Sequence, residues 1–266
     1  MLGAIVGDIV GSRFEFQDIA AQGFELFGQG CRFTDDTVMT AAVAAAILDS
    51  KGDWSNLEKA TIVRMRSLGQ RFAEAGYGSN FKKWLFAEDP KPYESFGNGA
   101  AMRVSPCGLA AESIEEATIM AHKVTAVSHN HPEGLKGAEA TAVAVFMAKR
   151  GDSAQEIGKI ISDHYYQLDY NPPPFSGAKR PSISCQVTVP RAMVCFLSAK
   201  NYEEAIRRAV YLGGDTDTTA AIAGSVAGAY FSIPATLKER ALALLDPSLV
   251  EIVEAFEAKY APGLRL

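Results

Sequence analysis

Alanine-rich segments with helical periodicity dominate this chain. In TVMTAAVAAAILDS (residues 37–50) and EEAIRRAVYL (residues 203–212), apolar side chains recur three and four positions apart, as on one face of a helix. Strict alternation, which is typical of a strand, is best in QVTVP (residues 186–190), and that run is short. The sequence therefore predicts an all-α, compact multi-helix fold. Helices are expected at 37–50, 57–75, 113–126, 132–150, 154–167, 189–199, 202–212, 216–231, 234–245 and 249–260.

Size and charge narrow the class of protein. The chain has 266 residues, of which 48% are hydrophobic and 21% charged, so it can bury a sizeable core. The Gly- and Pro-rich stretch 171–182 has the composition of a linker, but chemistry-bearing motifs lie on both sides of it. We therefore expect one domain, residues 1–266, with a long surface loop. The net charge of −5 argues against nucleic acid or anionic lipid as a partner.

The ends and the cysteines suggest a cytoplasmic protein. The N-terminal segment has no basic leader before an apolar run, which argues against a signal peptide. The uncharged stretch 218–237 is built from Ala, Gly, Thr and Ser and contains Pro234, so we do not expect a membrane span there. No CxxC pair or zinc-finger spacing occurs, which predicts buried thiols in a reducing compartment for Cys31, Cys107, Cys185 and Cys195.

Two similar motifs, far apart in the chain, each open an alanine-rich helix. Phe33-Thr34-Asp35-Asp36-Thr37 precedes one helix, and Gly213-Gly214-Asp215-Thr216-Asp217-Thr218-Thr219 precedes the other. Helix capping explains one carboxylate or hydroxyl at each start, because such groups satisfy the free amides and suit the helix dipole. Each motif supplies more than capping needs, which indicates a site.

If the two helix starts face each other, four carboxylates converge. Like charges roughly 4 Å apart repel by about 4 kcal/mol at an effective dielectric near 20, so the cluster requires cations. Two divalent ions would balance Asp35, Asp36, Asp215 and Asp217, with Thr34 and Thr218 as neutral oxygen ligands. Oxygen ligands favour Mg²⁺ or Mn²⁺ over zinc.

Three further segments carry weaker signals. Gly97-Asn98-Gly99-Ala100-Ala101-Met102-Arg103 offers exposed amides that suit a phosphate, although a plain glycine turn explains it equally well. Ser128-His129-Asn130-His131-Pro132-Glu133 brings two of the four histidines together before a helix, where a capping segment is the alternative. Gly3, Gly7 and Gly11 recur every fourth residue, which is typical of close helix packing, and Asp8 and Glu15 lie seven residues apart on the same stretch.

Taken together, these motifs resemble the ADP-ribosylglycohydrolases, an all-helical family. GAIVGDIVGSRFE, FTDDT, GNGAAMR, SHNHPE and GGDTDTTAAIAGSVAGAYFSIP occur in the family's order over nearly the whole chain. The resemblance implies a binuclear magnesium site whose ligands are Thr34, Asp35, Asp36, Asp215, Asp217 and Thr218, with Asp217 bridging. It also assigns catalytic roles to Glu15 and Asp36, and substrate binding to Asp8, Gly97, Asn98, Gly99, His129 and His131, with the choice between the two histidines left open.

The family cleaves the bond between C1″ of ADP-ribose and an acceptor. The resemblance implies ADP-ribosyl arginine as the first choice and ADP-ribosyl serine as the next, with residues 93–96 near the acceptor. A free derivative such as O-acetyl-ADP-ribose is an alternative substrate. A non-catalytic, metal-dependent ADP-ribose-binding module and a two-metal phosphoesterase that cleaves the diphosphate are alternative functions. We expect the metals to hold the ribose hydroxyls and a water, while Asp36 or Glu15 takes a proton.

Overall fold

The computed structural model of the protein describes residues 1–15, 23–175 and 183–262. Within these ranges the backbone forms helices and no strand, and Gly97 and Ser184 make an isolated antiparallel bridge. Short 3₁₀ turns follow α1 (Ser12–Phe14), precede α3 (Trp54–Asn56) and lie in the loop of residues 97–101 (Asn98–Ala100), which we call the Gly97 loop. The helices are α1 (Leu2–Gly11), α2 (Asp35–Ser50), α3 (Leu57–Arg71), α4 (Ser79–Phe86), α5 (Ser105–Ala110), α6 (Ile114–Ala126), α7 (Pro132–Arg150), α8 (Ala154–His164), α9 (Cys185–Leu197), α10 (Tyr202–Tyr211), α11 (Thr216–Tyr230), α12 (Ala235–Leu242) and α13 (Pro247–Tyr260).

The all-helical prediction is confirmed, and it holds even where alternation of apolar and polar residues is clearest. QVTVP, the best strand candidate, lies inside α9, which begins at Cys185 and contains Pro190. Proline removes one helical hydrogen bond, to the carbonyl of Gln186, and that residue is exposed. The cost of the proline is therefore low, and the alternation of Val187 and Val189 over so few residues does not decide the backbone. Part of the predicted surface loop, residues 176–182, lies outside the described residues.

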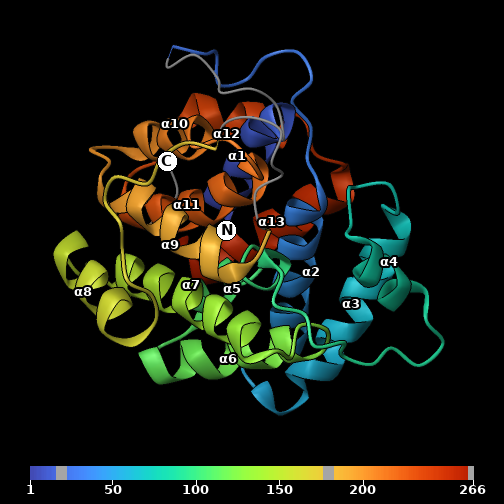
Figure 1. Ribbon diagram of the computed structural model, residues 1–266. Helices are drawn as coiled ribbons and strands as arrows, with labels where there is room; N and C mark the ends of the chain where they lie inside the picture. The colour runs from blue at the N-terminus through green and yellow to red at the C-terminus, as the bar shows by residue number, and fades with distance from the viewer. Residues whose placement is uncertain (16–22, 176–182, 263–266) are drawn as a thin grey trace.

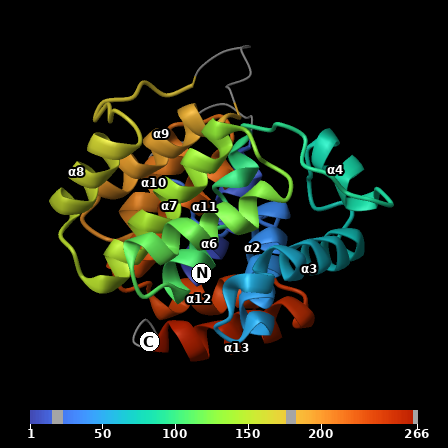
Figure 2. The ribbon, with the colours of Figure 1, turned by 90° about the horizontal axis from the view of Figure 1, so that it is seen from below.

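The helix α11 lies at the centre of the molecule. It packs against α1, α7, α9 and α10, and 14 of its 15 residues are buried. Figures 1 and 2 show α3 and α4 along one side of this centre, α8 at the opposite edge, and α12 and α13 beside the N-terminus. Small side chains let the neighbours approach, which explains why the central helix is built from alanine, glycine and threonine.

Glycines bring α1 and α11 into backbone contact, as their spacing predicted. A Cβ on Gly3 would lie 2.3 Å from the carbonyl oxygen of Gly224, and one on Gly7 would lie 2.1 Å from that of Ala220. A Cβ on Gly11 would lie 2.4 Å from the carbonyl oxygen of Thr216. The pairing order shows that the helices are antiparallel, so the end of α1 meets the start of α11.

Asp8 on α1 connects the start of α2 to the pair of α1 and α11 through hydrogen bonds. Its carboxylate accepts hydrogen bonds from the backbone N–H of Thr34 at 2.9 Å and of Thr37 at 3.0 Å, and from both threonine hydroxyls. Asp8 is 0% exposed, so these bonds take the place of water. The ends of three helices are thereby held at one point.

We predict that Gly7→Ala destabilises the protein. The added methyl has no room against the backbone of α11, and overpacking of this kind costs about 1–3 kcal/mol of unfolding free energy. Urea unfolding followed by circular dichroism measures the change. Gly23→Ala is the matched control, because a Cβ there meets nothing within 4 Å. Equal stability of the two variants would contradict the proposed packing constraint.

Candidate active site

Carboxylates from three elements gather where the end of α1 meets the starts of α2 and α11. Single carboxylate oxygens of Asp8, Asp36 and Asp217 lie within 4.8 Å of one another, and so do those of Glu15, Asp215 and Asp217. Asp217 belongs to both groups. The two threonine and aspartate motifs, 182 residues apart at Asp36 and Thr218, therefore do meet in space.

Capping accounts for only part of this arrangement. The Thr34 hydroxyl accepts a hydrogen bond from the Asp36 backbone N–H at 3.3 Å and so caps α2. Asp215 stands at the cap position of α11 but makes no side-chain cap hydrogen bond. Its carboxylate instead accepts a hydrogen bond from Asn98 Nδ2 at 2.6 Å, and the Thr218 hydroxyl donates to Asp36 Oδ2 at 3.1 Å. The surplus acids are thus available for another role.

Burial and mutual repulsion raise the proton affinity of the cluster. Burial, followed by the charges of Asp8 and Asp215, raises the pKa of Asp35 to about 8. Burial also raises the pKa of Asp36 and of Asp217 well above the usual aspartate value. The pKa of Glu15 is raised by burial and then by the charge of Asp215. Without cations, the cluster holds protons near neutral pH.

The donor set fits divalent cations. Asp36 Oδ1 is buried and has no hydrogen-bond partner in the described part of the chain, an arrangement that is costly for a carboxylate. A cation beside it would supply the missing interaction and would weaken the repulsion between Asp36 and Asp217. Carboxylate and hydroxyl oxygens are the ligands that hard cations such as Mg²⁺ and Mn²⁺ prefer.

A cavity of about 420 Å³ opens over the cluster. The Gly97 loop forms the facing wall, where a Cβ on Gly99 would lie 3.3 Å from His129 Nε2, so glycine leaves room there for the imidazole. Tyr93 and Ser95, from the segment expected near the acceptor, also line the cavity. The wall contains these predicted site residues: Glu15, Asp35, Asp36, Gly97, Asn98, Gly99, His129, Asp215, Asp217 and Thr218.

Asp8, Thr34 and His131 are not among the residues that line the cavity. Asp8, predicted to bind substrate, lies beneath the wall, and its oxygens are used by Thr34 and Thr37. His131 caps α7, because its Nδ1 accepts the backbone N–H of Glu133 at 3.1 Å. Of the two candidate histidines, His129 is therefore the one in the cavity.

Comparison with known proteins identifies the family of the chain. The family model for ADP-ribosylglycohydrolase matches residues 1–262. The chain belongs to the ADP-ribosylglycohydrolase family. Membership makes it a glycosidic-bond hydrolase, so the acidic cavity over α2 and α11 is the natural place for the active site.

Individual relatives of this ADP-ribosylglycohydrolase cover most of its length. ADP-ribosylhydrolase ARH3 of Mus musculus is 26% identical over 309 residues, covering 88% of this chain and 83% of that protein. The ADP-ribosyl-[dinitrogen reductase] glycohydrolase of Rhodospirillum rubrum is 28% identical over 261 residues, covering 87% and 84%. A solved structure titled "ADP-ribosylglycohydrolase-related protein complex" has the same fold, with a TM-score of 0.74 at 24% identity over 97% of this chain and 95% of that one.

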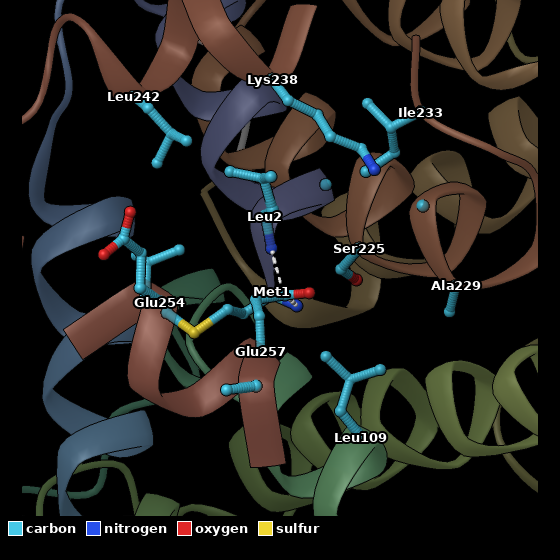
Figure 3. Close-up of a pocket in the computed structure, with 14 residues that line it drawn as sticks. Met1, Leu2, Leu109, Ser225, Ala229, Ile233, Lys238, Leu242, Glu254 and Glu257 are labelled. Atoms are coloured by element: carbon cyan, nitrogen blue, oxygen red, sulfur yellow. Dashed lines mark hydrogen bonds and ion pairs between the residues drawn. The ribbon is translucent and has the colours of Figure 1, made fainter. Parts of the chain in front are cut away.

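A second cavity, of about 550 Å³, lies at the opposite end of the α1 and α11 pair (Figure 3). Its wall is mainly apolar and includes Leu2, Leu109 and Ile233. Glu257 accepts hydrogen bonds there from the backbone nitrogens of Met1 at 2.8 Å and Leu2 at 3.0 Å. Its lining contains no histidine or cysteine and makes no carboxylate cluster with metal-ligand spacing within the described ranges, so size alone does not make it the reactive site.

The sequence did not predict two features of the cavity, namely the hydrogen bond from Asn98 to Asp215 and the position of Arg103. Asn98 belongs to the predicted glycine loop, but its bond to Asp215, which ties that loop to α11, depends on contacts 117 residues apart. Arg103 lines the cavity although it is 1% exposed, and it forms no ion pair with a carboxylate in the described ranges. The sequence signal for the burial of Arg103 is the uncharged run Gly99 to Met102 directly before it.

We predict that the protein in EDTA loses stability as the pH rises from 6.5 to 8. The pKa of Asp35 is about 8 when folded and near 3.8 when unfolded. The folded state therefore binds more protons than the unfolded state over this range. The free energy of unfolding falls as the pH rises towards the folded pKa, by up to about 1.4 kcal/mol per pH unit. Urea unfolding in EDTA at several pH values measures the slope.

The matched variants for this experiment are Asp35→Asn and Asp163→Asn. Asp35→Asn should flatten the slope, whereas Asp163→Asn, which changes an exposed aspartate on α8, should leave it unchanged. Burial lowers the pKa of His129. This histidine affects the pH slope mainly below its ordinary pKa, so the range starts at pH 6.5. Stability that is constant or increases with pH in EDTA would refute the prediction.

Proposed function

We propose that this chain is a metal-dependent hydrolase that removes ADP-ribose from a modified acceptor by cleaving the bond at C1″. The position of Asp217 in both carboxylate groups carries the proposal, because one residue shared by two oxygen-rich sites suits a pair of cations. We assign Mg²⁺ to both sites, with Mn²⁺ as the substitute. The proposed ligands are Thr34, Asp35, Asp36, Asp215, Asp217 and Thr218.

The proposed ligands differ in how directly they face the cavity. Asp36, Asp217 and Thr218 line it, and the unpartnered Asp36 Oδ1 is free to accept a cation. Thr34 would use the remaining lone pair of a hydroxyl that already donates to Asp8 at 2.6 Å and caps α2. Bound cations supply charge neutralisation and polarisation of oxygen ligands.

The side chains and backbone of the cavity would bind and orient the sugar and its diphosphate. Gly97, Asn98 and Gly99 would line the diphosphate and ribose, and His129 would face the ribose from the same wall. The bond from C1″ to the acceptor breaks as a water oxygen adds to C1″, and the proton that the water loses is passed on to the departing acceptor. The transition state resembles an oxocarbenium ion, which nearby carboxylates stabilise.

Glu15 suits the proton-accepting role better than Asp36. It lines the cavity and is only partly buried, so it can reach a water that approaches the sugar. Asp36 is 2% exposed, and its Oδ2 already accepts a hydrogen bond from Thr218. We therefore assign Glu15 as the general base and Asp36 as a metal ligand.

Arginine is the proposed acceptor residue, with serine second and a free ADP-ribose derivative such as O-acetyl-ADP-ribose third. The order rests on the resemblance in the sequence motifs. The proposed partner is an ADP-ribosylated protein or small molecule in the cytoplasm, and no nucleic acid. In the described ranges, no helix has the length and apolarity needed to cross a bilayer.

Product analysis by mass spectrometry tests the proposal. Equal amounts of arginine- and serine-ADP-ribosylated peptides are incubated with the protein in Mg²⁺ and then in excess EDTA. We expect intact ADP-ribose to be released in Mg²⁺ only, and from the arginine peptide first. Release of AMP would instead identify a phosphoesterase. Binding without release would identify a non-catalytic module, and inactivity on both peptides would point to a free ADP-ribose derivative.

We predict that Asp217→Asn lowers turnover at least about a hundredfold. Losing a partner of a metal ligand already costs about 10–100-fold, and Asp217 is a proposed ligand that belongs to both carboxylate groups. Release of ADP-ribose measures turnover, and circular dichroism checks that the variant is folded. Asp163→Asn is the control and should keep full activity. Unchanged turnover in folded Asp217→Asn would remove the metal assignment.

A further inference from the structure

Arg103 is a buried cation that has no carboxylate partner in the described ranges, where its Nε also lacks a hydrogen-bond partner. Its Nη2 donates to Ser128 Oγ at 2.8 Å and, with longer contacts of 3.5 and 3.4 Å, to the carbonyls of Val124 and Thr125. Both carbonyls belong to the last turn of α6, the negative end of that helix, which favours a cation. The guanidinium also lies 5.7 Å from the centre of the Phe81 ring.

Ser128 connects this cation to the cavity histidine. Its Oγ lies 2.8 Å from Arg103 Nη2 and 2.9 Å from His129 Nδ1. A guanidinium has only donors, so the serine oxygen accepts from Arg103. The single hydroxyl hydrogen then has His129 Nδ1 as its acceptor.

The opposite arrangement leaves a buried donor unsatisfied. If Nδ1 carried the proton and donated to Ser128, the serine oxygen would accept twice and its own hydrogen would need another acceptor. Ser128 is 0% exposed, so water does not supply one. A buried polar hydrogen without a partner is costly, so the first arrangement is favoured.

The proton of the neutral ring therefore lies on Nε2, which faces the Gly97 loop. A Cβ on Gly99 would lie 3.3 Å from Nε2, and one on Gly97 would lie 3.9 Å away. His129 lines the cavity, so this N–H is directed at whatever binds there. Burial and the charge of Arg103 lower the pKa of His129, which keeps the ring neutral.

We propose that Arg103 and Ser128 are positioning residues that hold His129 as the Nε2–H tautomer, so that the cavity presents a hydrogen-bond donor beside the Gly97 loop. The ligand must then place an accepting oxygen, such as a sugar hydroxyl or ring oxygen, at this point. The identity of the ligand rests on the proposed function, whereas the tautomer does not.

Long-range proton–nitrogen NMR of the full chain, labelled with ¹⁵N-histidine and kept in Mg²⁺ without substrate, tests the tautomer. The spectrum of His129→Gln identifies the His129 signals by their absence. We expect His129 to show a protonated Nε2 and an unprotonated Nδ1. A protonated Nδ1 or a charged ring in the unmodified protein would overturn the proposal, and this result needs no variant to fold.

Ser128→Ala separates a positioning role from simple packing. Removing the hydroxyl should turn the single tautomer into a mixture, while Ser225→Ala, which removes another buried serine hydroxyl, should leave the His129 signals unchanged. An unchanged Nε2–H pattern in folded Ser128→Ala would also overturn the proposal. Arg103→Lys, which keeps the cation and a donor, should preserve the pattern better than Arg103→Met.

Calorimetric titration with ADP-ribose connects the tautomer to binding. Only the Nε2–H tautomer donates to the ligand, so an equal mixture of tautomers should weaken binding to Ser128→Ala about twofold, with Ser225→Ala equal to the unmodified protein. Equal affinity in Ser128→Ala would overturn the link to the ligand. If the unmodified protein does not bind ADP-ribose, the proposed function fails, while the NMR result still decides the tautomer.

Discussion

The backbone contact between α1 and α11 is the constraint on which the site depends. Three glycines, at positions 3, 7 and 11, let the two helices lie closer than any side chain allows. Because the helices are antiparallel, this contact brings Glu15, just after α1, to Asp215 and Asp217 at the start of α11. Asp8, on the middle turns of α1, then draws in the start of α2.

Helix ends give the site its electrostatic character. The starts of α2 and α11 both direct the positive ends of their dipoles toward the carboxylates, which lowers the cost of gathering these charges. That help is too small to offset several buried charges, as the raised pKa values of Asp35, Asp36 and Asp217 show. Cations complete the balance in the proposed enzyme. Across the cavity, Arg103 contacts the C-terminal, negative end of α6. Helix termini therefore face charged groups on both walls of the cavity.

The sequence predicted the features that depend on local composition. The two aspartate and threonine motifs were expected to meet, and the glycine spacing was expected to bring helices together; both expectations are confirmed. The short helices α4 and α5 were missed, because eight and six residues give little periodicity.

What the sequence did not reveal is how side chains share hydrogen bonds across long separations. Asp8 was expected on the substrate side, but its carboxylate is buried and accepts hydrogen bonds from Thr34 and Thr37 at the start of α2. His129 and His131 were indistinguishable as neighbours in one motif, and only the start of α7 shows that His131 is a cap. The partnership of Arg103, Ser128 and His129 depends on the turn that follows α6, which no spacing rule describes.

The antiparallel glycine contact also bears on how the protein is made. The first helix of the chain finds its partner more than 200 residues later, so α1 cannot bury its apolar residues until α11 has been synthesised. Contacts this distant in sequence form late, because the intervening chain must first be closed into a loop. On the ribosome, a nascent chain that stops before α11 therefore lacks Asp217, the residue shared by both carboxylate groups, and has an exposed first helix. Only a chain that includes α11 assembles the acidic cluster.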